Sequence, residues 1–77
     1  MGQELTFGEK AVGLTFNPDG DVLVETVKEH YAQLIDALND LRNKPHQLPE
    51  VIRMLSVAIT EAETSQMWAV KAITWKH

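Results

Sequence analysis

Apolar positions follow a helical spacing through the middle of the chain. From about residue 22 to residue 42 they recur at alternating steps of three and four, the heptad spacing of helices that pack against each other. This first seam consists of Val24, Val27, Tyr31, Leu34, Leu38 and Leu41. Polar side chains fill the other faces, and Asp21 precedes the pattern as a capping residue. We therefore predict a first long helix over residues 21–43.

A second helical pattern begins after a short break. Pro45 cannot continue the first helix, and Pro49 suits the first turn of the next. The second seam consists of Ile52, Leu55, Ile59, Ala62, Gln66, Ala69 and Ile73. Because the connection is short, the two helices should lie side by side and antiparallel. The pattern predicts a second long helix over residues 49–75 and an all-α hairpin.

Residues 1–20 lack this periodicity. All four glycines of the chain lie in this segment, and Asn17-Pro18-Asp19-Gly20 has the composition of a β-turn. We expect a short N-terminal segment that leads into the hairpin through this turn. With only 77 residues, the chain should form a single domain over residues 1–77.

The second helix has more apolar surface than one partner can cover. Near its end, apolar side chains surround almost the whole circumference: Met67, Trp68, Ala69, Val70, Ala72, Ile73 and Trp75. The first helix covers one stripe, so the N-terminal segment or other chains must cover the rest. A chain this short has a small core, and without cysteine it has no disulfide to support that core. We therefore expect a homo-oligomer.

Charge and hydropathy exclude several kinds of partner. The net charge of −4 argues against binding to DNA or RNA, which requires a basic face. That charge is uneven, since residues 1–64 have a net charge of −6 and residues 65–77 of +2. No apolar run approaches the roughly 18 residues of a membrane span, and the N-terminus lacks the apolar region of a secretory signal. We expect neither membrane nor nucleic acid as a partner.

Residues suited to catalysis or metal binding do not form a recognisable motif. Ser56 and Ser65 lie within the second predicted helix, without the strained turn that exposes a nucleophile. The three histidines lack the spacing of metal ligands, and no Gly-rich phosphate loop is present. We expect no enzyme activity, no metal ion and no cofactor.

The segment over residues 60–66, TEAETSQ, is polar for the middle of a helix in so small a protein. One interpretation is that these side chains form a face of the helix that is exposed to solvent. The other is that small hydroxyl side chains permit close helix approach or contact a polar ligand between subunits. The sequence leaves both open.

Aromatic and basic residues provide the candidate binding chemistry. Phe16, beside the turn, can stack on a base, and Lys28 in the first helix can reach a phosphate. Lys71 lies between Trp68 and Trp75 at helical spacing, so its ammonium should lie on an aromatic face. Each also has a structural interpretation: Phe16 as a lid on the hairpin, Lys28 as a surface charge and Lys71 as a snorkelling side chain.

Together, the aromatic turn, the lysine in the first helix and the segment QMWAVKAI over residues 66–73 resemble the phage anti-CBASS nucleotide sponges. These small helical-hairpin proteins share a domain with part of the phage anti-Thoeris sponges. The resemblance covers most of the chain from about residue 12. It implies a compact homohexamer that sequesters cyclic oligonucleotide immune signals without cleaving them, in the cytoplasm of the infected bacterial host.

The resemblance also implies which residues bind the ligand. Lys28 matches the family's lysine that contacts the phosphates of a cyclic dinucleotide. Phe16 is the best match for the tyrosine that stacks on a base, although it lacks the hydroxyl and stands closer to the lysine; Asn17 beside it belongs to the same candidate site. Lys71 aligns with an arginine associated with a separate site for cyclic trinucleotides, and lysine keeps the charge but loses the bidentate fork.

We therefore expect a sponge that binds cyclic dinucleotides and also cyclic trinucleotides at the second site. Three alternatives stay open. The first is a sponge for cyclic ADP-ribose-type signals, which also combine bases with phosphates. The second is a helical protein–protein adaptor that docks through the apolar end of its second helix. The third is a degrading enzyme such as a metal-free phosphodiesterase.

Overall fold

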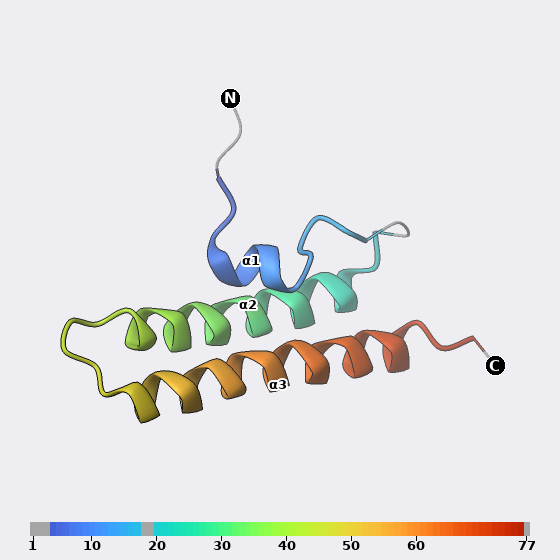
Figure 1. Ribbon diagram of the computed structural model, residues 1–77. Coiled ribbons are helices and arrows are strands. Elements are labelled where there is room, and N and C mark those ends of the chain that lie inside the picture. The colour runs from blue at the N-terminus through green and yellow to red at the C-terminus, as the bar shows by residue number, and fades with distance from the viewer. Residues whose placement is uncertain (1–3, 18–19, 77) are drawn as a thin grey trace.

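The computed structural model describes residues 4–17 and 20–76, and these ranges contain three helices and no strand (Figure 1). The helices are α1 (Phe7–Ala11), α2 (Val22–Arg42) and α3 (Pro49–Ile73). The all-α fold class is therefore confirmed. The predicted turn over residues 17–20 includes Pro18 and Asp19, and His77 is the last residue of the chain; these three lie outside the described residues.

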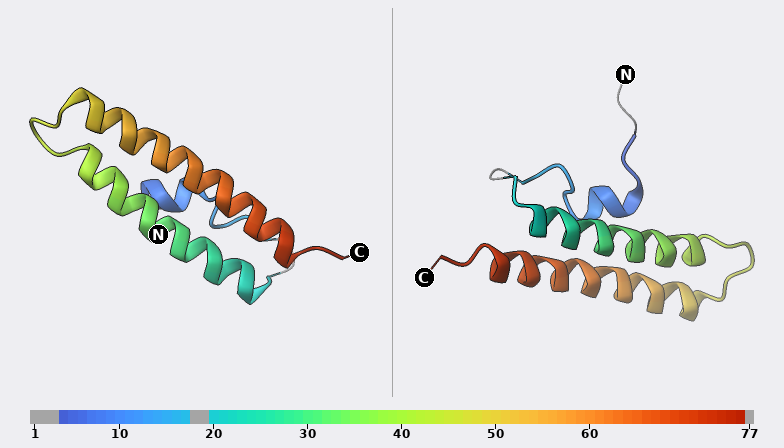
Figure 2. Two further views of the ribbon diagram at one scale, coloured as in Figure 1. Left: turned by 90° about the horizontal axis from the view of Figure 1, so that it is seen from below. Right: turned by 180° about the vertical axis from the view of Figure 1, so that it is seen from behind.

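The two long helices, α2 and α3, run antiparallel and side by side, joined by a short connection at one end (Figure 1). Figure 2 shows from two further directions that α1 lies against the hairpin on the α2 side. α3 ends at Ile73, two residues earlier than predicted, with Thr74 as its C-cap. Trp75 therefore follows the helix instead of belonging to it.

The buried face of α2 is displaced from the predicted seam. Val24, Lys28, Ala32 and Ile35 are its buried residues. Leu34 and Leu41, which the seven-residue repeat placed in the seam, are 49% and 43% exposed. The seam was predicted for a single partner helix. α2 packs against both α3 and α1, so more than one of its faces is covered.

A short helix, α1, was not predicted from the hydrophobic pattern. Thr6 and Glu9 form a capping box: Thr6 Oγ1 accepts from the Glu9 backbone N–H at 3.1 Å, and Glu9 Oε1 accepts from the Thr6 N–H at 2.8 Å. The Gly8 N–H donates to Asp36 Oδ1 at 2.7 Å and so attaches α1 to α2. The Thr-x-x-Glu spacing is visible in the sequence and would have revealed this helix start.

The core is small, and the molecule is flat. Among the described residues, the buried apolar side chains are Val12, Val24, Ala32, Ile35, Ile59 and Ala62. The Cα radius of gyration is 14.0 Å, and the principal extents are 47 × 36 × 12 Å. A compact chain of this length would have a radius of gyration of about 11.5 Å. A single copy therefore leaves much of its apolar surface in contact with water.

Within the part of the chain that the structure describes, no helix has the length and hydrophobicity needed to cross a membrane.

Candidate functional site

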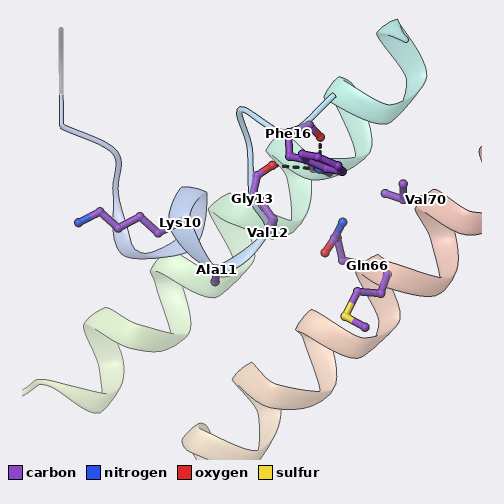
Figure 3. A pocket seen from close by; sticks show the side chains of 9 residues that line it. Lys10, Ala11, Val12, Gly13, Phe16, Gln66 and Val70 are labelled. Atoms are coloured by element: carbon purple, nitrogen blue, oxygen red, sulfur yellow. Dashed lines mark hydrogen bonds between the residues drawn. The ribbon is translucent and has the colours of Figure 1, made fainter. Parts of the chain in front are cut away.

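Lys28 lies at the centre of the candidate site. It is buried on α2, with 4% of its surface exposed. Its Nζ donates to the Gly13 carbonyl oxygen at 2.9 Å and to the Phe16 carbonyl oxygen at 2.6 Å, and these bonds are the dashed lines in Figure 3. The interpretation of Lys28 as a surface charge is therefore wrong, because its ammonium holds the turn over residues 13–16 against α2.

The turn over residues 13–16 is shaped by glycine and by its own backbone bonds. Gly13 adopts φ +61°, a left-handed conformation that favours glycine. The Phe16 N–H donates to the Gly13 carbonyl oxygen at 2.9 Å, which closes the turn. The Phe16 side chain is 72% exposed, and its ring centroid lies 5.5 Å from Lys28 Nζ. The turn thus presents an open aromatic face beside a buried cation.

The charge of Lys28 is only partly compensated. Burial lowers the pKa of Lys28, because desolvation disfavours the protonated amine. An ammonium has three N–H donors, and two of them are used by the Gly13 and Phe16 carbonyls. One donor therefore remains for a ligand. An anion placed there would favour the charged form and raise the pKa again.

The Asn17 amide is committed to the backbone that follows it. Its Nδ2 donates to the Asp21 carbonyl oxygen at 2.9 Å, and its Oδ1 accepts from the Asp21 N–H at 3.2 Å. Both ends of the amide are therefore used to hold the chain at the start of α2. Asn17 also lines a small inner cavity of about 170 Å³ together with Phe16 and Lys28. The structure thus brings these three predicted site residues together.

A larger cavity opens between the turn and α3. Its volume is about 480 Å³, within the range of roughly 300–1,000 Å³ typical of small-molecule sites. It is lined by Lys10, Ala11, Val12, Gly13, Phe16, Lys28, Gln66, Met67 and Val70 (Figure 3). We call it the Phe16–Lys28 cavity.

Gln66 is a lining residue that was not among the predicted site residues; the sequence placed it in the second seam and at the end of the polar segment over residues 60–66. In Figure 3 its side chain points from α3 toward the turn, whereas Lys10 extends away from it. Gln66 is only 5% exposed. The signal that could have found it is a polar residue at a position where the periodicity requires burial.

Lys71 lies apart from this cavity. Its Nζ is 5.0 Å from the Trp68 ring centroid and 5.8 Å from that of Trp75, so the expected contact with an aromatic face is confirmed. A separate cavity of about 470 Å³ is lined by Trp68, Lys71, Ala72 and Trp75. The structure therefore does not place Lys71 with Phe16 and Lys28. Throughout residues 4–17 and 20–76, no cluster of three or more His, Cys, Asp or Glu side chains could hold a metal ion.

The fold and the site define a class: a small helical hairpin with an aromatic–cation cavity of the size of a small-molecule site. The family model of the Acb2/Tad1 hairpin domain matches residues 9–74, and the chain belongs to this family. It is the family of the anti-CBASS and anti-Thoeris sponges, non-catalytic proteins that bind nucleotide immune signals. Comparison with curated proteins and with solved structures finds no match.

Proposed function

We propose that this protein binds cyclic dinucleotides in the Phe16–Lys28 cavity and lowers their free concentration without cleaving them. The observation that carries the proposal is the exposed Phe16 ring beside the buried Lys28 ammonium. Stacking of a base on an aromatic side chain contributes about 1–3 kcal/mol and is available to every base. The remaining Lys28 donor supplies a charged hydrogen bond to a phosphate oxygen.

We further propose that the ligand is held between subunits of a homo-oligomer, which the resemblance implies is a hexamer. A cyclic dinucleotide has near two-fold symmetry. A two-fold interface would present Phe16 and Lys28 from each of two copies, once for each half of the ligand. Sequestration needs only affinity and stoichiometry, and we expect it in the cytoplasm of the infected bacterial host.

A second candidate site, for cyclic trinucleotides, is supported by the separate cavity at Lys71. Trp68 and Trp75 offer stacking faces there, and the Lys71 ammonium supplies positive charge. Lysine lacks the bidentate fork of arginine, so we expect this site to bind its ligand more weakly than the Phe16–Lys28 cavity does.

A depletion and release experiment tests the function. The purified protein is mixed with a 3′,3′-cyclic dinucleotide, free ligand is measured, and the measurement is repeated after the protein is denatured. We expect depletion followed by recovery of intact ligand. Linear product would indicate a degrading enzyme. Absence of depletion with every cyclic dinucleotide, cyclic trinucleotide and cyclic ADP-ribose isomer would contradict the sponge and favour the adaptor.

Substitutions locate the site. Phe16→Ala should weaken cyclic dinucleotide binding at least tenfold, because a stacking contact worth about 1–3 kcal/mol is lost from each copy. Lys28→Ala should also weaken it, while oligomer mass is unchanged. Phe7→Ala is the matched control: the Phe7 ring also lies 5.5 Å from a cation, Arg42, but does not line the cavity. Equal affinities of the parent, Phe16→Ala and Lys28→Ala would show that the ligand binds elsewhere.

A further inference from the structure

Lys28 is bonded to the same turn that carries the stacking residue. Its Nζ lies 2.9 Å from the Gly13 carbonyl oxygen and 2.6 Å from the Phe16 carbonyl oxygen (Figure 3). The Gly13 oxygen also accepts from the Phe16 N–H at 2.9 Å, so the lysine and the bond that closes the turn share one acceptor atom. Buried with 4% of its surface exposed, Lys28 therefore helps to determine where the Phe16 ring lies.

The two ends of the turn are attached by bonds that do not involve Lys28. On one side, the Leu14 N–H donates to the Glu9 carbonyl oxygen of α1 at 3.0 Å. On the other, the Asn17 amide bonds to the Asp21 backbone. Between these attachments, the Lys28 ammonium joins two carbonyls of the turn to α2. Removal of the ammonium should therefore release the middle of the turn while both ends stay in place.

The ring and the ammonium face the same space. Phe16 and Lys28 both line the Phe16–Lys28 cavity and the inner cavity of about 170 Å³, and Nζ lies 5.5 Å from the ring centroid. An anion at the third N–H of Lys28 favours the charged amine, and a charged donor forms stronger hydrogen bonds than a neutral one. A bound phosphate would thus strengthen the two bonds that hold the ring in place.

We propose that Lys28 is a positioning residue for Phe16, so that phosphate binding at the ammonium and base stacking on the ring reinforce each other. Without the ammonium the ring is still present, but it must be ordered when the base arrives, and this ordering lowers the affinity. The inference rests on the proposed function, because it requires a ligand that brings a base and a phosphate into the Phe16–Lys28 cavity together.

A double-mutant cycle tests this coupling by titration calorimetry with cyclic di-AMP and with cyclic di-GMP. The variants are Phe16→Ala, Lys28→Met, which removes the ammonium and keeps an unbranched side chain, and both together. We expect at least tenfold weaker binding for Phe16→Ala and about hundredfold for Lys28→Met, with the double variant within about threefold of Lys28→Met. Independent contacts would multiply to a loss of about a thousandfold, and that result overturns the coupling.

Phe7 and Arg42 provide the matched control cycle. Their ring centroid and guanidinium carbon are also 5.5 Å apart, and neither residue lines the cavity. Phe7→Ala, Arg42→Met and the double variant should bind like the parent; losses equal to those of the first cycle would overturn the proposal. A lysine that only stabilised the fold would lower the melting temperature in Lys28→Met and leave the affinity of the folded protein unchanged, which also overturns it.

Hydrogen exchange tests the positioning role without a substitution at Lys28. The N–H of residue 16 donates to the same Gly13 oxygen that Lys28 binds. In Phe16→Ala, where no base can stack, saturating ligand should still slow exchange of this N–H at least threefold, because a phosphate at Lys28 strengthens the hold on the turn. Unchanged exchange overturns the coupling.

The outcomes separate the two proposals. A parent protein that binds neither cyclic di-AMP nor cyclic di-GMP overturns the proposed function, and the positioning role of Lys28 with it. A parent that binds either ligand, with independent losses in the Phe16 and Lys28 variants, overturns the positioning role alone.

Discussion

At Gly8, α1 approaches α2 so closely that no side chain fits. A Cβ atom at this position would overlap the carbonyl oxygen of Ala32 and crowd the Asp36 carboxylate, which accepts from the Gly8 N–H. Lys28 shows the opposite case, in which a long side chain is required because its ammonium reaches the Gly13 and Phe16 carbonyls. Gly8 and Lys28 therefore both hold the N-terminal segment against α2.

We predict that Gly8→Ala destabilises the protein by about 1–3 kcal/mol, the usual cost of overpacking. Alanine favours a helix over glycine by about 1 kcal/mol, but the clash involves backbone that cannot move without separating α1 from α2. The measurement is urea unfolding at a fixed protein concentration. Glu29→Ala, at an exposed position of α2, is the control and should change the free energy of unfolding by less than about 0.5 kcal/mol. An unchanged or increased value for Gly8→Ala would contradict the close approach.

The N-terminus of α2 contributes to the stability of the helix and also holds the segment next to Phe16 in the candidate site. The Asp21 carboxylate caps the helix by accepting from the Leu23 N–H at 2.8 Å and the Val24 N–H at 3.4 Å. The Asp21 backbone is also held by both ends of the Asn17 amide, next to Phe16. The cap therefore supports the segment that carries the stacking residue as well as the helix itself.

We predict that Asp21→Ala lowers the free energy of unfolding by about 1 kcal/mol. Asp21→Asn keeps an acceptor oxygen for the cap, so its free energy of unfolding should stay close to that of the parent. Asp40→Ala, near the end of the same helix, is the matched control. It removes an acidic charge where the helix dipole disfavours one, so stability should be unchanged or slightly higher. The free energy of unfolding of all three variants is measured by urea denaturation, with circular dichroism as the signal. Equal losses for Asp21→Ala and Asp40→Ala would mean that the cap contributes nothing.

As a whole, one copy of the chain leaves its apolar surface incompletely covered. Trp68 is 65% exposed, Met67 64% and Trp75 59%, close together at the end of α3. Exposed apolar patches of this kind are typical of protein interfaces. The flat shape is consistent with the same interpretation, because a thin layer of helices buries little surface by itself.

We predict that the melting temperature rises with protein concentration, because assembly stabilises the folded chain by mass action. Trp68→Glu should lower the mass measured by light scattering and reduce that concentration dependence. Lys44→Glu, which changes charge on the connection between the long helices, is the control and should keep the parent mass. A parent mass of one chain, with a melting temperature independent of concentration, would contradict the oligomer.

Much of the fold could be predicted from sequence because its signals are local. The periodicity of apolar residues indicates two long helices, and Pro45 in the connection separates them. α1 is too short to show periodicity, so only its capping box indicates it. The exposed Leu34 and Leu41 could not be predicted, because the seven-residue repeat does not say how many partners a helix has.

The sequence by itself determined the helical hairpin, the aromatic and basic residues that carry the binding chemistry, and the family. These follow from residue type and spacing along the chain. Only the tertiary structure decided that Lys28 is buried and holds the Phe16 turn, that Lys71 lies in a different cavity, and that Gln66 lines the Phe16–Lys28 cavity. The physical reason is that burial and hydrogen-bond partnership depend on groups distant in sequence, which packing alone brings together.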